Sequence, residues 1–349
     1  MKINCFMRIG LMLLIVFSCA NEKTPIKNKY KKRSPMADYF LMEGNKFLKK
    51  HDFKRALALA DSAELYAIKK DDVYFFKGRI YSELGRFSKA DQAYNYTINI
   101  NPDYIGAWNN LGNNAFRQQN FSQAVEYYKK EIIKNKTSIP FRALGRAYVE
   151  LGKTDSARIC FQHAIDINNN YASAYLNLAQ LEEDEGSLNK ALQLASRAYA
   201  LEPNNVEYQY VYSTILVQMD RGKEAIYSLR EIIKEWPWHH GAHYNLGRAL
   251  IQSGQKVEGQ QYLDESEKIR ANQAKIDHLE NTIRALPDDP YSYAALAFAL
   301  RKVGRFNDSM HSYKVALYLD PDNYDIWNNV ANLYLLQRDT IKALDTYNY

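Results

Sequence analysis

The sequence IGAWNNLGNNAFRQQNFSQAVEYYKKEIIKNKT, residues 105–137, has the pattern of two short amphipathic helices joined by a tight turn. The first helix carries Trp108 and the Leu111-Gly112 step, and the second carries Ala124 and Tyr128. Because Gly112 and Ala124 are small, the two backbones can approach closely as an antiparallel hairpin. A single hairpin leaves an apolar face uncovered, so the pattern predicts a copy of itself on each side.

The same pattern of aromatic, small residue, turn, alanine and aromatic recurs along the chain every 33 or 34 residues. After one longer interval it resumes for two more copies, again 34 residues apart. The copies start near Ala37, Asp71, Ile105, Ser138, Ala172, Val206, His240, Pro290 and Tyr324.

This period and residue pattern resemble those of the tetratricopeptide repeat family. The resemblance implies an all-α fold, a right-handed superhelical solenoid of antiparallel helix pairs. It predicts seven repeats over residues 37–273 and two more over residues 290–349, the last of them incomplete. The recurring glycine of the first helix is found at Gly44, Gly78, Gly112, Gly145 and Gly247.

The interval of residues 240–289 is longer than one repeat. Ile276, Leu279, Ile283 and Leu286 follow helical spacing, so residues 274–289 are predicted to be an extra helix or the continuation of a long second helix. The sequence stops inside the last second helix with no polar capping helix beyond it. We therefore expect this end to be covered by a partner or by a second copy of the chain.

Residues 1–18 have a basic start and an apolar run too short to span a bilayer, which indicates a signal peptide. Val16-Phe17-Ser18-Cys19 resembles the bacterial lipobox, which implies lipidation of Cys19 and a place in the bacterial cell envelope, most readily the periplasmic face of the outer membrane. Residues 19–36 are then a basic, flexible tether. The alternative is an ordinary cleaved leader with a coincidental cysteine.

The net charge of +6 comes from the leader and the tether, because residues 37–349 hold 38 Lys or Arg and 39 Asp or Glu. A nucleic-acid-binding protein would carry its basic residues clustered on the folded body. No nucleic-acid partner is therefore expected.

No motif in the sequence indicates an enzyme, a cofactor or a metal site. His239 and His243 have the spacing of zinc ligands on one helical face, but no third ligand is evident, and an aromatic turn between repeats is the simpler interpretation. The acidic residues 182–185 are predicted to be a solvated turn. The chain has no phosphate loop, dinucleotide turn or nucleophile elbow.

The family resemblance implies that first helices line a concave groove and that particular side chains on them bind a peptide or a partner. Arginines can pair with carboxylates and asparagine amides with a peptide backbone. The alternative for the arginines is local pairing, Arg79 with Glu83 and Arg146 with Glu150. The candidate groove residues are Arg79, Asn109, Asn110, Asn113, Arg142, Arg146, Asn177, Tyr210, Tyr244, Asn245 and Arg248.

These patterns predict a non-enzymatic scaffold for protein–protein interaction, held in the envelope by its lipid and serving the assembly of an envelope complex. One alternative is a surface lipoprotein that recognises glycan or peptidoglycan through the groove aromatics Tyr210 and Tyr244. Another is the repeat arm of a transferase, which would need a catalytic domain for which this sequence has no room.

Overall fold

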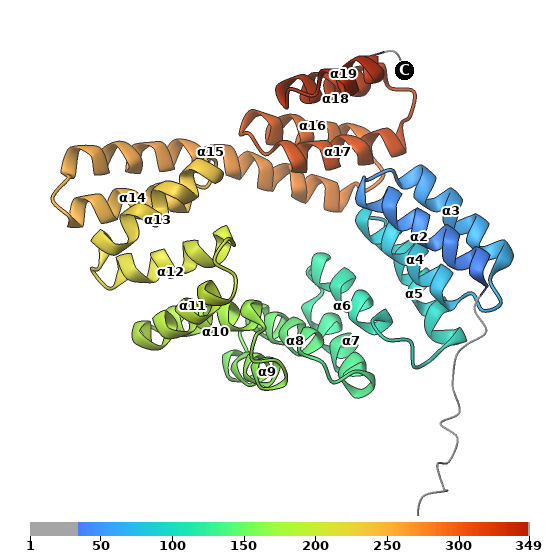
Figure 1. The fold of residues 1–349 in the computed structure, drawn as a ribbon, viewed down its shortest axis with the longest axis horizontal. Coiled ribbons are helices and arrows are strands. Elements are labelled where there is room, and N and C mark those ends of the chain that lie inside the picture. Colours follow the sequence, from blue (N-terminus) through green and yellow to red (C-terminus); the bar gives the residue numbers. More distant parts are fainter. Residues whose placement is uncertain (1–33, 348–349) are drawn as a thin grey trace, which may run out of the picture.

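The computed structural model describes residues 34–347, and this part of the chain contains eighteen helices and no strand (Figure 1). The predicted all-α solenoid of antiparallel helix pairs is confirmed. The predicted signal peptide and Cys19 lie outside the described residues, and the last residues of the predicted tether already belong to the first described helix. No helix in the described part has the length and apolar character needed to cross a membrane.

Consecutive helices form hairpins whose first helix begins at the predicted residue in every pair but the first and the third. The turn inside each hairpin passes through one residue in the left-handed region, a glycine in some pairs and a larger residue such as His51 in others. The helices are α2 (Pro35–Lys49), α3 (Phe53–Tyr66), α4 (Asp71–Glu83), α5 (Phe87–Ile100), α6 (Ala107–Arg117), α7 (Phe121–Lys134), α8 (Ser138–Glu150), α9 (Thr154–Ile167), α10 (Ala172–Asp184), α11 (Leu188–Leu201), α12 (Val206–Gln218), α13 (Gly222–Glu235), α14 (His240–Gln252), α15 (Lys256–Ala285), α16 (Pro290–Lys302), α17 (Phe306–Leu319), α18 (Tyr324–Leu336) and α19 (Thr340–Tyr347).

At Gly78, Gly112 and Gly145 the recurring glycine of the first helix faces an aromatic ring on the second, whereas Gly44 faces Phe76 on the next first helix and Gly247 faces Gly259 and Leu263. A Cβ atom placed on Gly112 would lie 2.5 Å from Cε1 of the buried Tyr128, and Gly78 meets Tyr94 at the same distance. The two helices therefore approach closely at Gly112, as expected. The group that fills the space beside this glycine is the ring of Tyr128. This contact explains why the glycine and the aromatic recur together.

The first helices lie on the inner side of the curved array. Neighbouring first helices such as α8 and α10, or α10 and α12, are in backbone contact, whereas second helices of neighbouring pairs are not among the close helix pairs of the described chain. A stack of hairpins that is tighter along its first helices must curve toward them. The first helices therefore form the concave face.

One helix of 30 residues, α15, occupies the long interval between the seventh and eighth pairs. It starts as the second helix of the seventh pair against α14 and continues until it packs on α16. There the buried Ile276 joins Leu296 and Leu300 in one apolar cluster. No separate helix begins at residue 274, since α15 runs through that position and spans one side of the molecule (Figure 1).

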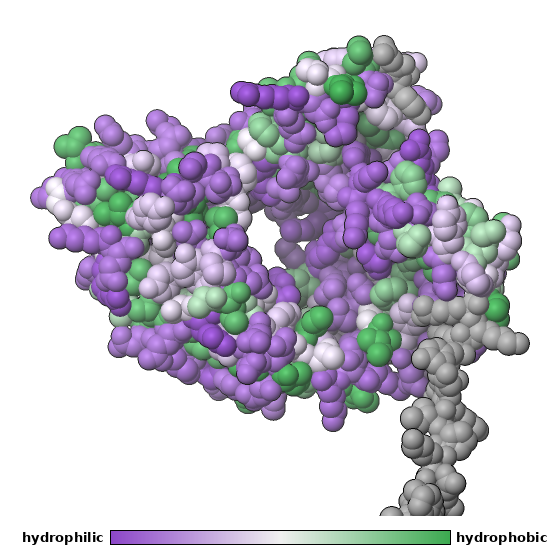
Figure 2. Space-filling model, viewed as in Figure 1, coloured by the Kyte–Doolittle hydropathy of each residue, from purple (hydrophilic) through white to green (hydrophobic). Residues whose placement is uncertain are grey.

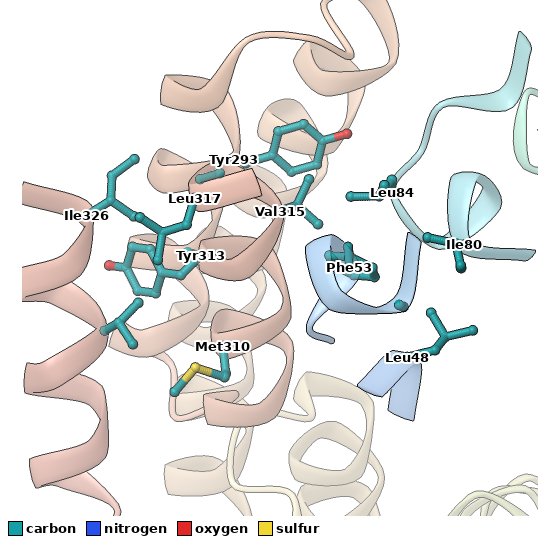
Figure 3. Packing of buried hydrophobic residues seen from close by; sticks show 14 of the residues in the cluster. Leu48, Phe53, Ile80, Leu84, Tyr293, Met310, Tyr313, Val315, Leu317 and Ile326 are labelled. Carbon is teal, nitrogen blue, oxygen red and sulfur yellow. The ribbon is translucent and has the colours of Figure 1, made fainter. Parts of the chain in front are cut away.

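The two ends of the array meet, so the described chain closes into a ring around a central opening (Figures 1 and 2). A single apolar cluster contains Phe53 and Leu84 from the N-terminal repeats and Tyr293 and Val315 from the C-terminal ones (Figure 3). We call this contact the clasp. Its members are His51, Phe53, Leu84 and Arg86 on one side and Asp288, Tyr293, His311, Lys314, Val315 and Tyr318 on the other.

The last helix pair lies beyond the clasp. Its large apolar side chains include Leu336, Ile341 and Leu344, each more than half exposed. The expectation that a partner or a second copy covers this end stays a prediction.

Candidate functional site

All the predicted groove residues lie on first helices, and therefore on the elements that form the concave face. They are Arg79 on α4; Asn109, Asn110 and Asn113 on α6; Arg142 and Arg146 on α8; Asn177 on α10; Tyr210 on α12; and Tyr244, Asn245 and Arg248 on α14. Their hydrogen bonds divide them into side chains that hold repeats together and side chains left open to a ligand.

Arg146, Asn177 and Tyr210 come together in one cavity of about 400 Å³ between α8, α10 and α12, which we call the inner hollow. Its lining is mixed, with apolar atoms from Val149, Phe161, Leu181 and Val211 and polar ones from side chains on all three helices. The remaining lining residues are Glu150, Gln180, Glu183, Asp184 and Thr214.

The cation that lines the inner hollow is Arg146. Its side chain is exposed, its guanidinium lies 4.9 Å from the centre of the Phe116 ring, and it forms no ion pair within residues 34–347. The local pair with Glu150 that the sequence allowed does not form. The charge of Arg146 is thus available to an incoming carboxylate.

Three acidic residues also line the inner hollow, Glu150, Glu183 and Asp184. Gln218 donates a hydrogen bond of 2.6 Å to Glu183, and burial raises the pKa of the Glu183 carboxyl. Burial also raises the pKa of the Tyr210 hydroxyl. The inner hollow therefore presents one cation and several acceptors within a small space.

Other predicted groove residues bind the neighbouring repeat. Arg142 donates from Nε to the hydroxyl of Tyr171 at 2.8 Å and from Nη1 to Asn177 at 3.4 Å. The buried Asn245 donates to Thr214 at 2.9 Å. Replacing either would loosen the stacking of repeats as well as any ligand contact.

The α4 and α6 residues show the same division. Arg79 donates to Asn45 on α2 at 2.9 Å and not to Glu83. Asn110 donates to the carbonyl of Gly106 at 2.7 Å, which is a contact within its own helix. Asn113 is exposed and accepts from the hydroxyl of Tyr128, whereas the buried Oδ1 of Asn109 has no partner within the described residues.

Tyr244 and Arg248 lie further along the concave face. Tyr244 is 47% exposed, and the guanidinium of Arg248 is 5.9 Å from the centre of its ring. The nearby histidines serve the fold: Nδ1 of His239 accepts from the Ala242 amide at 3.0 Å, and Nε2 of His243 bonds the Pro237 carbonyl at 3.1 Å. Residues 34–347 contain no group of three or more side chains placed to hold a metal ion.

The prediction that residues 182–185 form a solvated turn is wrong for Glu182. Its side chain is 3% exposed, and its carboxylate pairs with Arg158 at 3.0 Å and Lys190 at 2.8 Å. Glu183 lines the inner hollow but is not among the predicted groove residues, although it lies one turn after Gln180, another lining residue. That helical spacing was the available signal.

Comparison with known families supports the repeats individually. Models described as tetratricopeptide repeat match residues 71–104, 105–130 and 312–345, and one described as TPR repeat matches residues 145–184. Residues 184–266 match the model described as anaphase-promoting complex, cyclosome, subunit 3.

Characterised relatives share only modest identity with the chain. The human protein O-mannosyl-transferase TMTC1 is 24% identical over 58% of this chain, which spans only 22% of that protein. The BBSome complex member BBS4 homolog of Drosophila melanogaster is 21% identical over 86% of this chain and 61% of its own length. The type IV pilus assembly protein PilF of Pseudomonas aeruginosa is 24% identical over 38% of this chain and 54% of its own length.

Solved structures that share the fold include two from type IV pilus systems. The Pseudomonas aeruginosa PilF structure superposes with a TM-score of 0.53 at 16% identity, covering 61% of this chain and 97% of its own. PilW, described as a widely conserved type IV pilus biogenesis factor, gives 0.53 at 15% identity over 60% and 97%. The chain therefore carries tetratricopeptide repeats and has the all-helical solenoid fold of its structural neighbours.

Proposed function

We propose that this protein is a non-enzymatic scaffold that holds an extended segment of a partner protein along its concave face. The observation that carries the proposal is the inner hollow, where an unpaired arginine, two side-chain amides and an aromatic wall converge from three consecutive first helices. Two relatives support a binding role: PilF is named as a type IV pilus assembly protein, and the BBS4 homolog is named as a member of the BBSome complex.

The inner hollow offers each part of a peptide a suitable contact. Arg146 can bind a carboxylate of the segment, and Asn177 and Gln180 can pair with its backbone. Tyr210 offers a half-buried ring against which an apolar side chain can pack. Binding along the concave face would continue toward Asn113 on one side and toward Tyr244 and Arg248 on the other.

The envelope location is part of the same proposal. Lipidation at Cys19, after removal of residues 1–18, would place the repeats at the periplasmic face of the outer membrane. The pilus assembly proteins among the relatives and neighbours are consistent with service to an envelope complex. Replacing Cys19 with serine should move the protein from the membrane fraction to the soluble fraction of a bacterial host.

The binding site is tested by affinity capture from detergent-solubilised membranes with the wild type and Arg146→Glu. The matched control is Arg197→Glu on the second helix α11, because Arg197 is also exposed and lies over an aromatic ring, that of Tyr175. A partner retained by the wild type and by Arg197→Glu but lost by Arg146→Glu supports the proposal. Equal capture by all three proteins would rule out the inner hollow.

Capture of no specific protein would contradict the scaffold role itself. Binding of glycan or peptidoglycan fragments would then be measured with the same variants, with Tyr244→Ala added because Tyr244 is an exposed aromatic residue on a first helix.

A further inference from the structure

The clasp joins parts of the chain that are about 260 residues apart, and each of its hydrogen bonds uses a side chain on at least one side. Helices within a hairpin and between neighbouring repeats are in close backbone contact, whereas no helix pair across the clasp is among the close pairs of the described chain. The clasp is therefore the thinnest contact in the ring. It is where the ring can open with the least loss of packing.

Two imidazoles face each other in the clasp. Nδ1 of His51 lies 3.1 Å from Nδ1 of His311, and the ring centres are 4.6 Å apart. One nitrogen must donate its proton and the other must accept it, so this contact holds with the pair neutral or singly protonated. A second proton would set two N–H groups against each other.

Nearby charged groups also affect the protonation of the His51–His311 pair. Lys314 on α17, which donates to the carbonyl of Lys50, and Arg117 at the end of α6 oppose a positive charge on the pair. Glu83 at the end of α4 and Asp308 at the start of α17 favour it. Asp52 offsets part of the charge of Lys314.

A cavity of about 1140 Å³ runs alongside the clasp and is lined by His51, His311, Glu83, Arg117 and Asp308, among others. Protons can therefore reach the imidazoles while the repeats remain folded.

We propose that the clasp is a proton-released closure of the ring: uptake of protons by His51 and His311 in mildly acidic surroundings separates α3 from α17 and opens the concave face to a partner. This inference rests on the proposed scaffold function for its last step, but the opening itself does not depend on any partner.

The direction and size of the effect follow from the histidines. Burial and the facing His51 lower the pKa of His311 from 6.5 to about 4, and burial and Lys314 lower the pKa of His51. Groups with a lowered pKa favour the closed ring at neutral pH, and this contribution is lost as pH falls below 6.5. For His311 alone, the ratio of open to closed rings should rise about tenfold between pH 7.5 and 5.5.

Spin labels carried on keto-bearing residues in place of the exposed Lys54 and Asn307 would report the opening in the full-length chain. Double electron–electron resonance should show a short distance at pH 7.5 and a growing longer-distance population at pH 5.5. The His51→Asn/His311→Asn variant should lose this pH dependence, and asparagine accepts the left-handed backbone of residue 51. The control His278→Asn, on the exposed face of α15, should keep it.

Lys314→Met provides a test that leaves both histidines in place. Removing this cation should shift the opening of the ring to lower pH. If Lys314 had a purely structural role, the variant would change the fraction of closed rings but not the pH at which the rings open. A wild-type distance distribution that is the same at both pH values would overturn the clasp proposal, even if a partner is captured as described above. If the ring opens but the yield of captured partner does not change, the clasp does not control access of the partner to the concave face.

Discussion

The contact between Gly112 and Tyr128 allows a quantitative test of how each helix pair is built. In Gly112→Ala the added methyl would lie 2.5 Å from Cε1 and 2.7 Å from Cδ1 of the Tyr128 ring. That ring is 2% exposed, and its hydroxyl donates to Asn113 at 2.8 Å. The ring is fixed on both sides, so the backbones of α6 and α7 would have to separate.

The expected cost combines two opposing effects. Overpacking a well-packed core typically costs 1–3 kcal/mol, and a clash of this severity belongs at the upper end, about 3 kcal/mol. Alanine in a helix interior returns about 1 kcal/mol relative to glycine. Gly112→Ala should therefore lower the free energy of unfolding of this region by about 2 kcal/mol.

Amide hydrogen exchange over α6 and α7, followed by mass spectrometry, is the suitable assay, because repeat arrays need not unfold in one step. Tyr128→Leu should cost stability alone but relieve most of the loss in the double variant with Gly112→Ala. Tyr128→Phe should relieve none of it, since it keeps the ring. Gly112→Ala protein that matches or exceeds the wild type in protection would refute this account of the recurring glycine.

Three further predictions concern buried or paired carboxylates. Glu131, 1% exposed, accepts from the backbone amides of Gly106 and Asn109 at the start of α6, so Glu131→Ala should cost about 1–2 kcal/mol and speed hydrogen exchange in the first turn of that helix. Glu182→Ala should cost only about 1 kcal/mol in chemical denaturation, because Arg158 and Lys190 can return to solvent; a loss above about 3 kcal/mol would mean that they stay buried. Hydrogen bonding to Lys77 and Lys70 lowers the pKa of Glu64 to about 2, so its stabilising effect is present above pH 4.5 and disappears as pH falls from 4.5 toward 2. Glu64→Gln should flatten the dependence of stability on pH in that window.

The sequence was informative about the repeats because each repeat is specified locally. The spacing of Trp108, Gly112, Ala124 and Tyr128 already contains the helix period, the turn and the packing partners of one hairpin. A solenoid is made by repeating that unit, so correct local predictions were enough to predict the class of fold. The concave positions followed from the family resemblance placed on the same period, and every candidate groove residue lies on a first helix.

The bonds made by the groove residues could not be predicted in the same way. The sequence places Arg142 and Arg146 four residues apart on one helix face, with nothing to distinguish them. In the folded protein Arg142 donates to Tyr171 of the next repeat, while Arg146 is exposed, lies over the Phe116 ring and has no hydrogen-bond or ion-pair partner within residues 34–347. The difference depends on which aromatic residue the neighbouring repeat brings within reach, and that depends on the angle between repeats.

The closure of the ring depends on still longer-range geometry. Phe53 at the start of α3 and His311 within α17 look like ordinary second-helix positions, and they meet only because the small rotations of many repeats add up. The boundary predicted at residue 274, between the seventh repeat and an extra helix, came from the length of a repeat, although the sequence has no helix-stopping residue there. The uninterrupted α15 carries the chain from α14 to α16 and so sets the position at which α17 returns to α3.

A closed ring and an open groove compete for the same chain, and their balance determines what a partner must do. A partner that fits the concave face of the closed ring would hold the clasp shut, because binding to one state shifts the population toward it. A partner that needs the open array must supply the free energy of breaking the clasp, which lowers its apparent affinity by the fraction of rings that are open. Partner binding that strengthens at pH 5.5 would therefore identify the open array as the binding state, and binding that weakens would identify the closed ring.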